Sequence, residues 1–338
     1  MRGLAGVLSS RSGLQRLVVL YFHRVLEEPD PMFPDIPTRQ EFDRQMSALA
    51  GMFRVLPLGD AVDALAADRL PPAAVAITFD DGYADNFHTA LPVLRRYGLP
   101  ATFFVASAYL DGGVMFNDQV MEACRHLPVG SIDTGLPELG ILVLDSDTGR
   151  RALAEAVIGK IKYLAPSRRA ECAEALLDLA GCASPAGLMM TTDEVAKLSA
   201  HEVTVGAHTW SHPILAAVSE DQACTELKKG RQVLQEITGQ AVELFAYPNG
   251  RPRQDYGPRE VSLAQKTGFK AAFSTQWGCA DRRWDLWQLP RIAPWDRSGF
   301  KFGLRVTRAL VDRVQIARAN GDGSASGMRA ERSEQCGA

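Results

Sequence analysis

Residues 74–83 read Ala-Val-Ala-Ile-Thr-Phe-Asp-Asp-Gly-Tyr, and they carry the strongest signal for the fold. Its first six residues are apolar apart from one threonine, which is typical of a strand buried on both faces of a parallel sheet. The adjacent carboxylates Asp80 and Asp81 follow at once, and Gly82 permits a tight turn behind them. Residues 84–97 then have the pattern of a helix. The stretch therefore predicts a strand, a turn and a helix, with acidic residues at the carboxyl end of the strand.

The same apolar pattern recurs along the chain. Seven strands are predicted in all, at Leu17–His23, Ala74–Phe79, Ala101–Ala106, Glu202–Ala207, Val242–Tyr247, Phe269–Ser274 and Trp287–Ile292. Helical patterns separate most of them, and one opens with a capping box at Thr38-Arg39-Gln40-Glu41. This alternation predicts an α/β fold with a parallel sheet and helices outside it. Seven such units favour a closed or nearly closed barrel over the alternative, a doubly wound open sheet.

One segment is too long for a minimal strand–helix repeat. Residues 115–200 contain further helical patterns, and we predict a helical insertion there that roofs the mouth of the barrel. An enlarged crossover connection is the alternative. The barrel domain is predicted to span residues 16–319, after an N-terminal extension at residues 1–15. Residues 320–338 are polar and rich in Gly and Ser, which predicts a disordered tail.

The composition argues against several classes of protein. A net charge of −3 gives no reason to expect a nucleic acid as partner. The six cysteines form no CxxC pair, which argues against a zinc ribbon or a redox motif. No stretch reaches the roughly 18 apolar residues of a membrane-spanning helix. Because the N-terminus shows no clear signal peptide, we expect a cytoplasmic protein, either free or peripheral to a membrane.

A second polar cluster follows the predicted strand at 202–207. It reads His208-Thr-Trp-Ser-His212 and contains two of the six histidines in the chain. Two histidines at this spacing can bind one metal ion, although a pair of surface histidines is the more frequent explanation. Together with Asp81 they would form a common hydrolytic ligand set for a divalent metal, with Zn²⁺ as the default ion.

In that arrangement Asp80 would be free to take a proton from an attacking water. The alternative for Asp80 and Asp81 is an Asp-Gly turn that caps the following helix. Both hypotheses place the two carboxylates at a strand end, where the active sites of parallel barrels lie.

Three further clusters lie at predicted strand ends. The loop of Tyr247, Pro248 and Asn249 exposes backbone N–H groups that could stabilise an oxyanion, or it is merely a turn. His23 could protonate a leaving amine, or it is a structural histidine. Arg291 could hold the base through a charge-assisted hydrogen bond, or it forms a structural ion pair.

In this order the clusters resemble the polysaccharide deacetylase family, also known as NodB-homology or carbohydrate esterase family 4 proteins. Residues 78–82 (TFDDG) match the first motif of that family, and residues 208–212 (HTWSH) fit its second motif, H-[ST]-x-x-H. The resemblance runs from about Leu17 to Trp295. It implies a distorted (β/α)7 barrel, which agrees with the strand pattern.

The resemblance also implies roles for individual residues. Asp80 would be the general base, and Asp81, His208 and His212 would hold the metal. Arg291 resembles the arginine of the fourth motif.

The chain departs from the common family pattern at two motifs. The usual third motif carries an arginine where Ala246 stands, and the FAYPxG form resembles the branch that acts on exported β-linked N-acetylglucosamine polymers. The usual catalytic histidine lies downstream of the third motif, but no histidine follows His212. In the branch with an N-terminal Tyr-His motif, a first-strand histidine takes that role. His23 matches it, with Phe22 inserted, and would be the general acid.

The activity implied by the resemblance is metal-dependent removal of N-acetyl groups from an N-acetylated sugar or polysaccharide, with release of acetate. One alternative is a metal-independent glycoside hydrolase that uses Asp80 and another carboxylate. The other is a non-catalytic carbohydrate-binding relative. A metal bound at His208 and His212 would exclude the first alternative, and the intact Asp-Asp-His-His set argues against the second.

Overall fold

A computed structural model describes residues 15–201 and 203–311. The predicted tail at residues 320–338, and all but the last residue of the predicted extension, lie outside these ranges. The described strands form one eight-stranded sheet and a separate two-stranded sheet. In the described ranges, no helix combines the length and the apolar character needed to cross a membrane.

The larger sheet curls into a nearly closed barrel of parallel strands. Neighbouring strands follow the order β1-β3-β4-β7-β8-β9-β10, with β2 beside β3. Their bounds are β1 Leu17–Phe22, β2 Arg54–Val55, β3 Ala74–Phe79, β4 Ala101–Val105, β7 Val203–Ala207, β8 Leu244–Ala246, β9 Ala271–Trp277 and β10 Leu289–Arg291. The Tyr21 N–H donates to the Ile292 carbonyl (3.0 Å), and the Ile292 N–H donates to the Val19 carbonyl (2.8 Å), which brings the end of β10 back to β1. The predicted barrel is confirmed, each of the seven predicted strands overlaps one of its strands, and the open-sheet alternative is wrong. Two bounds differ: Trp287 and Gln288 form a short helical turn before β10, and Glu202 lies outside the described residues.

Each barrel strand is apolar throughout because both of its faces are buried. Along β1, Leu17 and Val19 belong to an interior cluster that also contains Phe104 and Phe273. Val18 and Leu20, one position along, belong to a second cluster beneath the outer helices. Because side chains alternate between the faces of a strand, one unbroken apolar run supplies both clusters.

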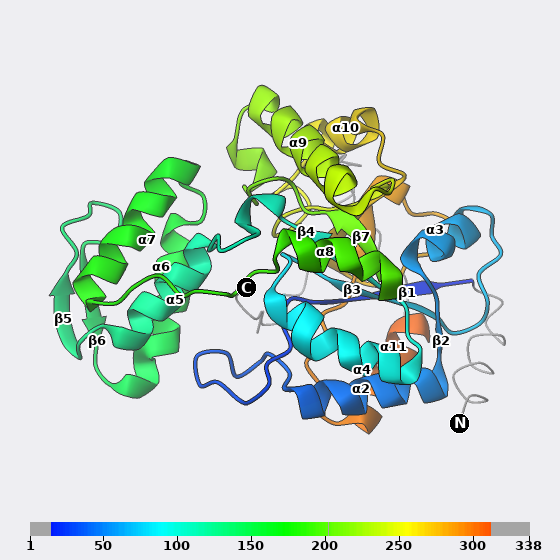
Figure 1. The fold of residues 1–338 in the computed structure, drawn as a ribbon, viewed down its shortest axis with the longest axis horizontal. Coiled ribbons are helices and arrows are strands. Elements are labelled where there is room, and N and C mark those ends of the chain that lie inside the picture. Colours follow the sequence, from blue (N-terminus) through cyan, green and yellow to red (C-terminus); the bar gives the residue numbers. More distant parts are fainter. Residues whose placement is uncertain (1–14, 202, 312–338) are drawn as a thin grey trace, which may run out of the picture.

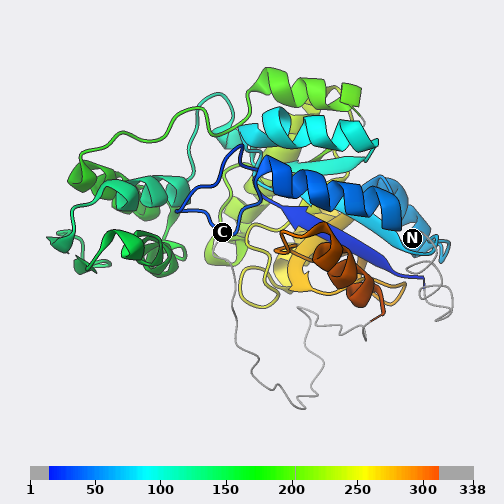
Figure 2. The same ribbon diagram turned by 90° about the horizontal axis from the view of Figure 1, so that it is seen from below.

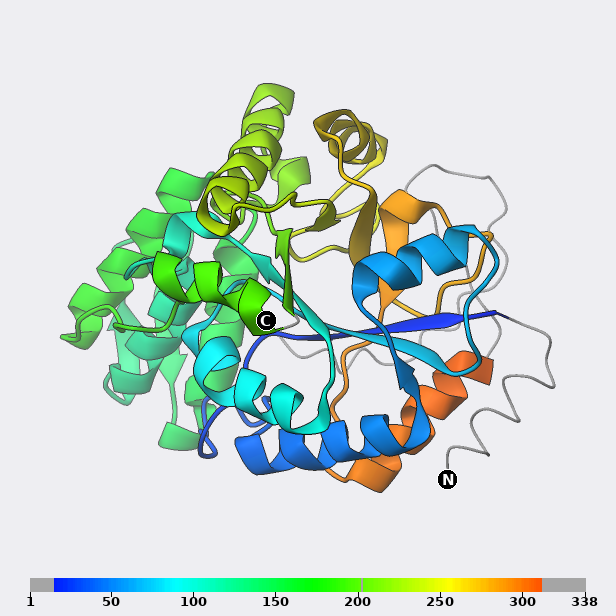
Figure 3. The same cartoon turned by 45° about the vertical axis from the view of Figure 1, so that its right-hand side comes forward.

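Helices surround the strands (Figures 1 and 3). The helices packed on the barrel are α2 Arg39–Met52, α3 Leu58–Ala66, α4 Leu91–Tyr97, α8 Thr192–Leu198, α9 Glu220–Thr238, α10 Pro258–Thr267 and α11 Gly299–Val311. The predicted capping box is present at α2, where Thr38 and Glu41 each accept the other's backbone N–H. The helix predicted at 84–97 begins with a π-helical turn at Asn86–Ala90 that leads into α4. Helix α3 packs against the interior cluster and covers the amino end of the barrel, which leaves the carboxyl end for a site.

The long segment between β4 and β7 forms a separate lobe beside the barrel (Figures 1 and 2). It contains α5 Phe116–His126, β5 Gly130–Asp133, β6 Ile141–Leu144, α6 Arg150–Ile161 and α7 Pro166–Ala180. These elements bury a core of their own, to which Val120, Leu142 and Val157 contribute. Helix α8 lies within the range predicted for the insertion, but it packs against α9 and β7 of the barrel. The lobe touches the barrel mouth where the Tyr83 hydroxyl binds the Asp118 carboxylate of α5 (3.0 and 3.2 Å).

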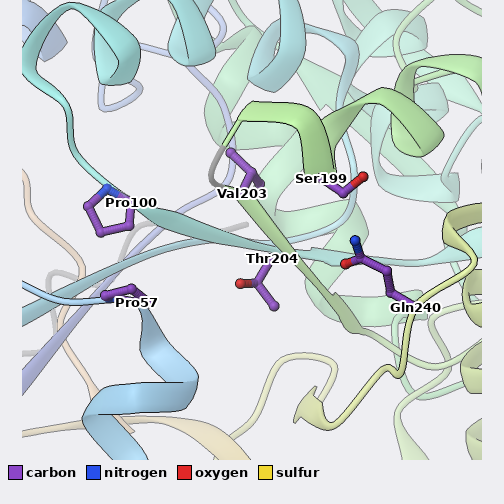
Figure 4. A pocket seen from close by; sticks show the side chains of 6 residues that line it. All are labelled: Pro57, Pro100, Ser199, Val203, Thr204 and Gln240. Carbon is purple, nitrogen blue, oxygen red and sulfur yellow. The ribbon is translucent and has the colours of Figure 1, made fainter.

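A hollow of about 400 Å³ lies at the amino end of the barrel (Figure 4). Its lining residues are Pro57, Pro100, Ser199, Val203, Thr204 and Gln240. Pro100 directly precedes β4 and Val203 begins β7, so the hollow lies at the opposite end from Asp80 and His208. None of the lining side chains is ionisable, and the hollow therefore offers no group for acid–base chemistry.

Candidate metal and catalytic site

The predicted site residues meet at the carboxyl end of the barrel. Asp80 directly follows β3, His208 follows β7, and His23 follows β1. Because all the barrel strands run parallel, their carboxyl ends lie at one mouth, as in other parallel barrels. His23 and His208, which are 185 positions apart in the sequence, thereby lie at the same mouth.

Asp81, His208 and His212 form a cluster with the geometry of a metal site. Asp81 Oδ1 lies 3.4 Å from His208 Nε2 and 3.3 Å from His212 Nε2. Two ligand atoms about 2.1 Å from one zinc ion at tetrahedral angles would lie about 3.4 Å apart, which agrees with both distances. Asp81 Oδ1 is buried and has no hydrogen-bond partner in the described chain. A buried carboxylate oxygen left in this state is costly, and a cation between it and the imidazoles would satisfy it.

The backbone takes unusual conformations to aim these side chains. Adjacent residues of a strand point to opposite sides, so Asp80 and Asp81 would diverge if β3 simply continued. Instead Asp81 adopts a left-handed conformation with φ of +76°, and Gly82 follows with φ of +95°. Thr209 and His212 are also left-handed, with φ of +63° and +52°. Each such residue costs about 1–3 kcal/mol, a strain typical of functional sites. The turn predicted at Gly82 therefore begins one residue earlier, at Asp81 itself.

Hydrogen bonding leaves the ε nitrogen of His208 as the ring atom that could bind a cation. His208 Nδ1 lies 2.7 Å from the Ala246 carbonyl oxygen, which can only accept, so Nδ1 carries a proton and donates it. In a neutral imidazole this leaves the lone pair on Nε2, which faces Asp81. A carbonyl that orients a ligand histidine in this way is typical of metal sites.

The charge states in this cluster follow from burial and from the nearby charges. Burial lowers the pKa of His212 to about 3, partly opposed by the charge of Asp81, so His212 is neutral and able to bind a cation. Burial alone would lower the pKa of His208, but the carboxylates of Asp81 and Asp80 outweigh it and raise that pKa. Burial alone would raise the pKa of Asp81, but the two imidazoles hold it below its usual range. Asp81 is therefore ionised.

Arg291 forms a buried, bidentate ion pair with Asp80. Arg291 Nη1 and Nη2 each lie 2.7 Å from one carboxylate oxygen of Asp80. Both side chains are almost fully buried, with exposed fractions of 0% and 2%. Burial alone would raise the pKa of Asp80, but the charge of Arg291 outweighs it and the pKa lies below its usual value. The charge-assisted hydrogen bond predicted for this pair is present.

Arg291 is itself held by groups that the sequence analysis did not single out. Its Nε donates to the Ser274 carbonyl (3.0 Å) and its Nη1 to the Thr78 hydroxyl (3.3 Å). Its guanidinium carbon lies 4.8 Å from the centroid of the Tyr21 ring. Thr78 stands two positions before Asp80 on the same face of β3, so the period-2 pattern could have identified it.

His23 lies at the same mouth as the two aspartates. Its ring lies edge-on to the Tyr21 ring, with 5.7 Å between the ring centroids, and the Tyr21 ring also faces the guanidinium of Arg291. The His23 carbonyl accepts from Asn86 Nδ2 (2.8 Å), and Arg24, the next residue, forms an ion pair with Asp85 (2.7 Å). These contacts fix the backbone on which the His23 ring stands.

The loop after β8 contains one core residue and one free donor. The Tyr247 side chain is fully buried, and its hydroxyl donates to the Trp287 carbonyl (3.0 Å). The backbone N–H of Tyr247 donates to the Phe273 carbonyl (3.0 Å). The structure therefore places Tyr247 beneath the loop as a support. Pro248 has no N–H group, but the Asn249 N–H has no acceptor within the described chain and remains available.

A parallel barrel whose mouth gathers two carboxylates and two imidazoles is suited to metal-assisted hydrolysis. The family model for polysaccharide deacetylases matches residues 67–130 and 151–272, more than half of the chain. The chain therefore belongs to the polysaccharide deacetylase family and is a hydrolase of that class. The matched residues include Asp80, Asp81 and both histidines of the cluster, whereas His23 and Arg291 lie outside them.

Individual relatives support the same assignment. YxkH of Bacillus subtilis (strain 168), named as a polysaccharide deacetylase, is 22% identical over 279 residues, which are 82% of this chain and 71% of YxkH. The structure of the deacetylase PplD of Streptococcus pyogenes, in complex with acetate, has a TM-score of 0.59 at 18% identity and covers 87% of this chain and 99% of PplD. IcaB from Ammonifex degensii has a TM-score of 0.56 at 20% identity, over 87% of this chain and 97% of IcaB. These solved structures share the barrel fold.

Proposed function

We propose that this chain removes N-acetyl groups from an N-acetylated glycan, with a divalent cation bound by Asp81, His208 and His212, and releases acetate. The observation that carries the proposal is the buried, unpartnered Oδ1 of Asp81, which faces two imidazole nitrogens beside a second carboxylate. Zn²⁺ suits one carboxylate and two imidazoles, and this set leaves a position for substrate.

Each remaining residue of the site has a task in this hydrolysis. When bound, the cation would supply the Lewis acid that polarises the amide carbonyl and lowers the pKa of water. Asp80, oriented by Arg291, takes the proton of the water whose oxygen attacks the carbonyl carbon. The Asn249 N–H donates to the carbonyl oxygen as negative charge develops on it. His23 then gives its proton to the amine nitrogen as the carbon–nitrogen bond breaks.

Two relatives support acetate as the product. The PplD structure contains acetate, and another structure with the same fold is that of a de-N-acetylase from Aggregatibacter actinomycetemcomitans, with a TM-score of 0.53. The glycoside hydrolase alternative needs a second carboxyl opposed to Asp80 across the sugar, with one member of the pair protonated. Asp80 is instead held by Arg291 with a lowered pKa, and its neighbour Asp81 faces the imidazoles.

Acetate release from a panel of N-acetylated glycans tests the proposal. The metal-free protein prepared with a chelator should release none, and added Zn²⁺ should restore the activity. Asp80→Asn should reduce the activity strongly even with Zn²⁺ added. Cleavage of glycosidic bonds by the metal-free protein, without acetate release, would show instead that the chain is a glycoside hydrolase.

A further inference from the structure

The loop between the two ligand histidines bends sharply, and contacts from other elements hold it in place. Residues 209–211 connect His208 to His212, with left-handed backbones at Thr209 and His212. Inside the loop, the Thr209 hydroxyl accepts the His212 N–H (3.0 Å). This single internal hydrogen bond leaves the N–H and carbonyl groups of residues 210 and 211 to be bound from outside the loop.

One carboxylate from helix α9 binds three donors of this loop. Glu226 Oε2 accepts the N–H groups of Trp210 (2.9 Å) and Ser211 (2.7 Å), and its Oε1 accepts the Ser211 hydroxyl (2.6 Å). Hydrogen bonds to an ionised acceptor are stronger than neutral ones. Glu226 therefore fixes the loop midway between the two ligands.

The same helix touches the loop one turn later. A Cβ at Gly230 would lie 2.5 Å from the carbonyl carbon and oxygen of Thr209, so only glycine allows this approach. Because Glu226 and Gly230 are four residues apart, they lie on one face of α9. The helix therefore packs directly against the loop at Gly230, one turn after Glu226.

A second element binds the opposite groups of the loop. The Trp210 carbonyl accepts the Ala108 N–H (2.8 Å), and the Ser211 carbonyl accepts the Tyr109 hydroxyl (3.0 Å). The donors of residues 210 and 211 therefore face α9 and their acceptors face the segment after β4. The position of the loop depends on both sides. On the α9 side, Glu226 accepts the three described hydrogen bonds, and the Lys229 ammonium lies over the Trp210 ring (3.1 Å).

We propose that Glu226 is a positioning residue for the metal site: its carboxylate sets the spacing of His208 and His212 and thereby the affinity for the divalent cation. This inference rests on the proposed function, because it assumes that these histidines bind a metal. Groups outside the ligand set that orient the ligands of a metal site change metal affinity by about 10- to 100-fold when they are removed. A merely structural glutamate would change the stability of the fold but not the zinc affinity of the folded protein.

Zinc affinity, measured on the purified full chain by competition with a chromophoric chelator, tests the proposal. Glu226→Ala should weaken Zn²⁺ binding about 10- to 100-fold. Glu226→Gln should keep it within about threefold, because the amide oxygen can accept both N–H groups and its NH2 can donate to Ser211 Oγ. The control is Glu236→Ala, at an exposed position of the same helix, where the side chain binds only Gln232 (2.8 Å). It should leave the affinity unchanged.

A second variant with a shorter acidic side chain keeps the proposal testable if Glu226→Ala does not fold. Glu226→Asp keeps the charge but withdraws the carboxylate by one methylene, so zinc affinity should fall while circular dichroism shows a folded chain. The proposal is overturned if the Ala and Asp variants fold and bind zinc within twofold of the unchanged protein, or if Glu236→Ala weakens binding as much. Zinc binding that depends on Glu226, without acetate release, would contradict only the proposed function. An unchanged protein that binds no zinc would overturn both.

Discussion

The two neighbouring carboxylates of the site are surrounded in opposite ways. Both carboxylate oxygens of Asp80 accept hydrogen bonds from Arg291. Arg291 also donates to the Thr78 hydroxyl and the Ser274 carbonyl. Asp81 lies one residue further along, and its Oδ1 has no hydrogen-bond partner in the described chain. Their exposed fractions are nearly equal, at 2% and 4%, so burial does not distinguish them. The difference is whether the protein itself satisfies the charge.

This difference fits the roles proposed for the two residues, Asp80 as the base and Asp81 as a metal ligand. When a guanidinium binds a buried carboxylate, it balances the charge and fixes the orientation of the carboxylate, which can then exchange a proton with a nearby water. A buried carboxylate whose oxygen faces imidazole nitrogens remains incomplete until a cation joins it. Substitutions at the two positions should therefore affect different measurements.

The largest effect is expected at Asp80. Asp80→Asn removes the proton acceptor and should lower kcat for acetate release by about 100- to 10,000-fold. Zinc affinity should remain within a few-fold, because the three ligand side chains are untouched. The measurement pairs steady-state kinetics with a zinc titration of the same preparation. Loss of zinc binding in this variant would show that the two aspartates do not have separate tasks.

Asp81→Asn should give the converse result. It replaces the anionic ligand by a neutral amide, so zinc affinity should fall by more than the roughly 10- to 100-fold typical of outer partners. In the unchanged protein, zinc at 100 times its dissociation constant should add about 2.7 kcal/mol to the free energy of unfolding. The variant should lose this increment at the same zinc concentration. Thermal denaturation with zinc and with a chelator measures both, and an increment retained in full would contradict the ligand assignment.

Arg291→Gln should shift the pH dependence of the reaction. The pKa of Asp80 now lies below its usual value because the charge of Arg291 outweighs burial. Without that charge, burial acts alone, so the pKa rises and the acid limb of kcat/KM should move to higher pH. Removing one partner of a buried pair also costs about 3–5 kcal/mol of stability.

The stability from this pair has its own pH dependence. Since the folded-state pKa of Asp80 is lowered, its contribution is complete above the unfolded value of about 3.9 and disappears as the pH falls through the folded value. Arg291→Lys keeps the charge and serves as the control. It should shift the acid limb of kcat/KM less than Arg291→Gln does. An acid limb that stays in place in Arg291→Gln would show that the limb does not report Asp80.

The smallest effect is expected at Tyr247, where the bond is neutral and lies beneath the site. Tyr247→Phe removes only the hydroxyl bond to the Trp287 carbonyl, a loss of about 1 kcal/mol in the free energy of unfolding. Zinc affinity should not change. Denaturant unfolding and the zinc titration measure the two quantities. A weaker zinc site in this variant would show that the loop after β8 is coupled to the ligands.

Much of the barrel could be predicted because two-sided burial produces unbroken apolar runs. The elements that were missed lack this signal. Strand β2 has only two residues, and the β5–β6 hairpin buries one face only, with Ile141 and Val143 exposed and Leu142 and Leu144 buried. A short alternating segment of this kind resembles many loops in sequence.

The sequence alone determined which side chains stand at strand ends: two aspartates, two histidines four residues apart, and a histidine and an arginine at the first and last strands. Local sequence patterns indicate buried strands and turns, and these residues come at the ends of the strands predicted in this way. The partners of these side chains depend on how the chain folds in space. Asp80 binds Arg291 across 211 positions of the chain because the barrel closes, and Asp81 reaches the imidazoles because its backbone turns left-handed. Distances between distant strands depend on how the whole barrel closes, and a local stretch of sequence does not contain that information.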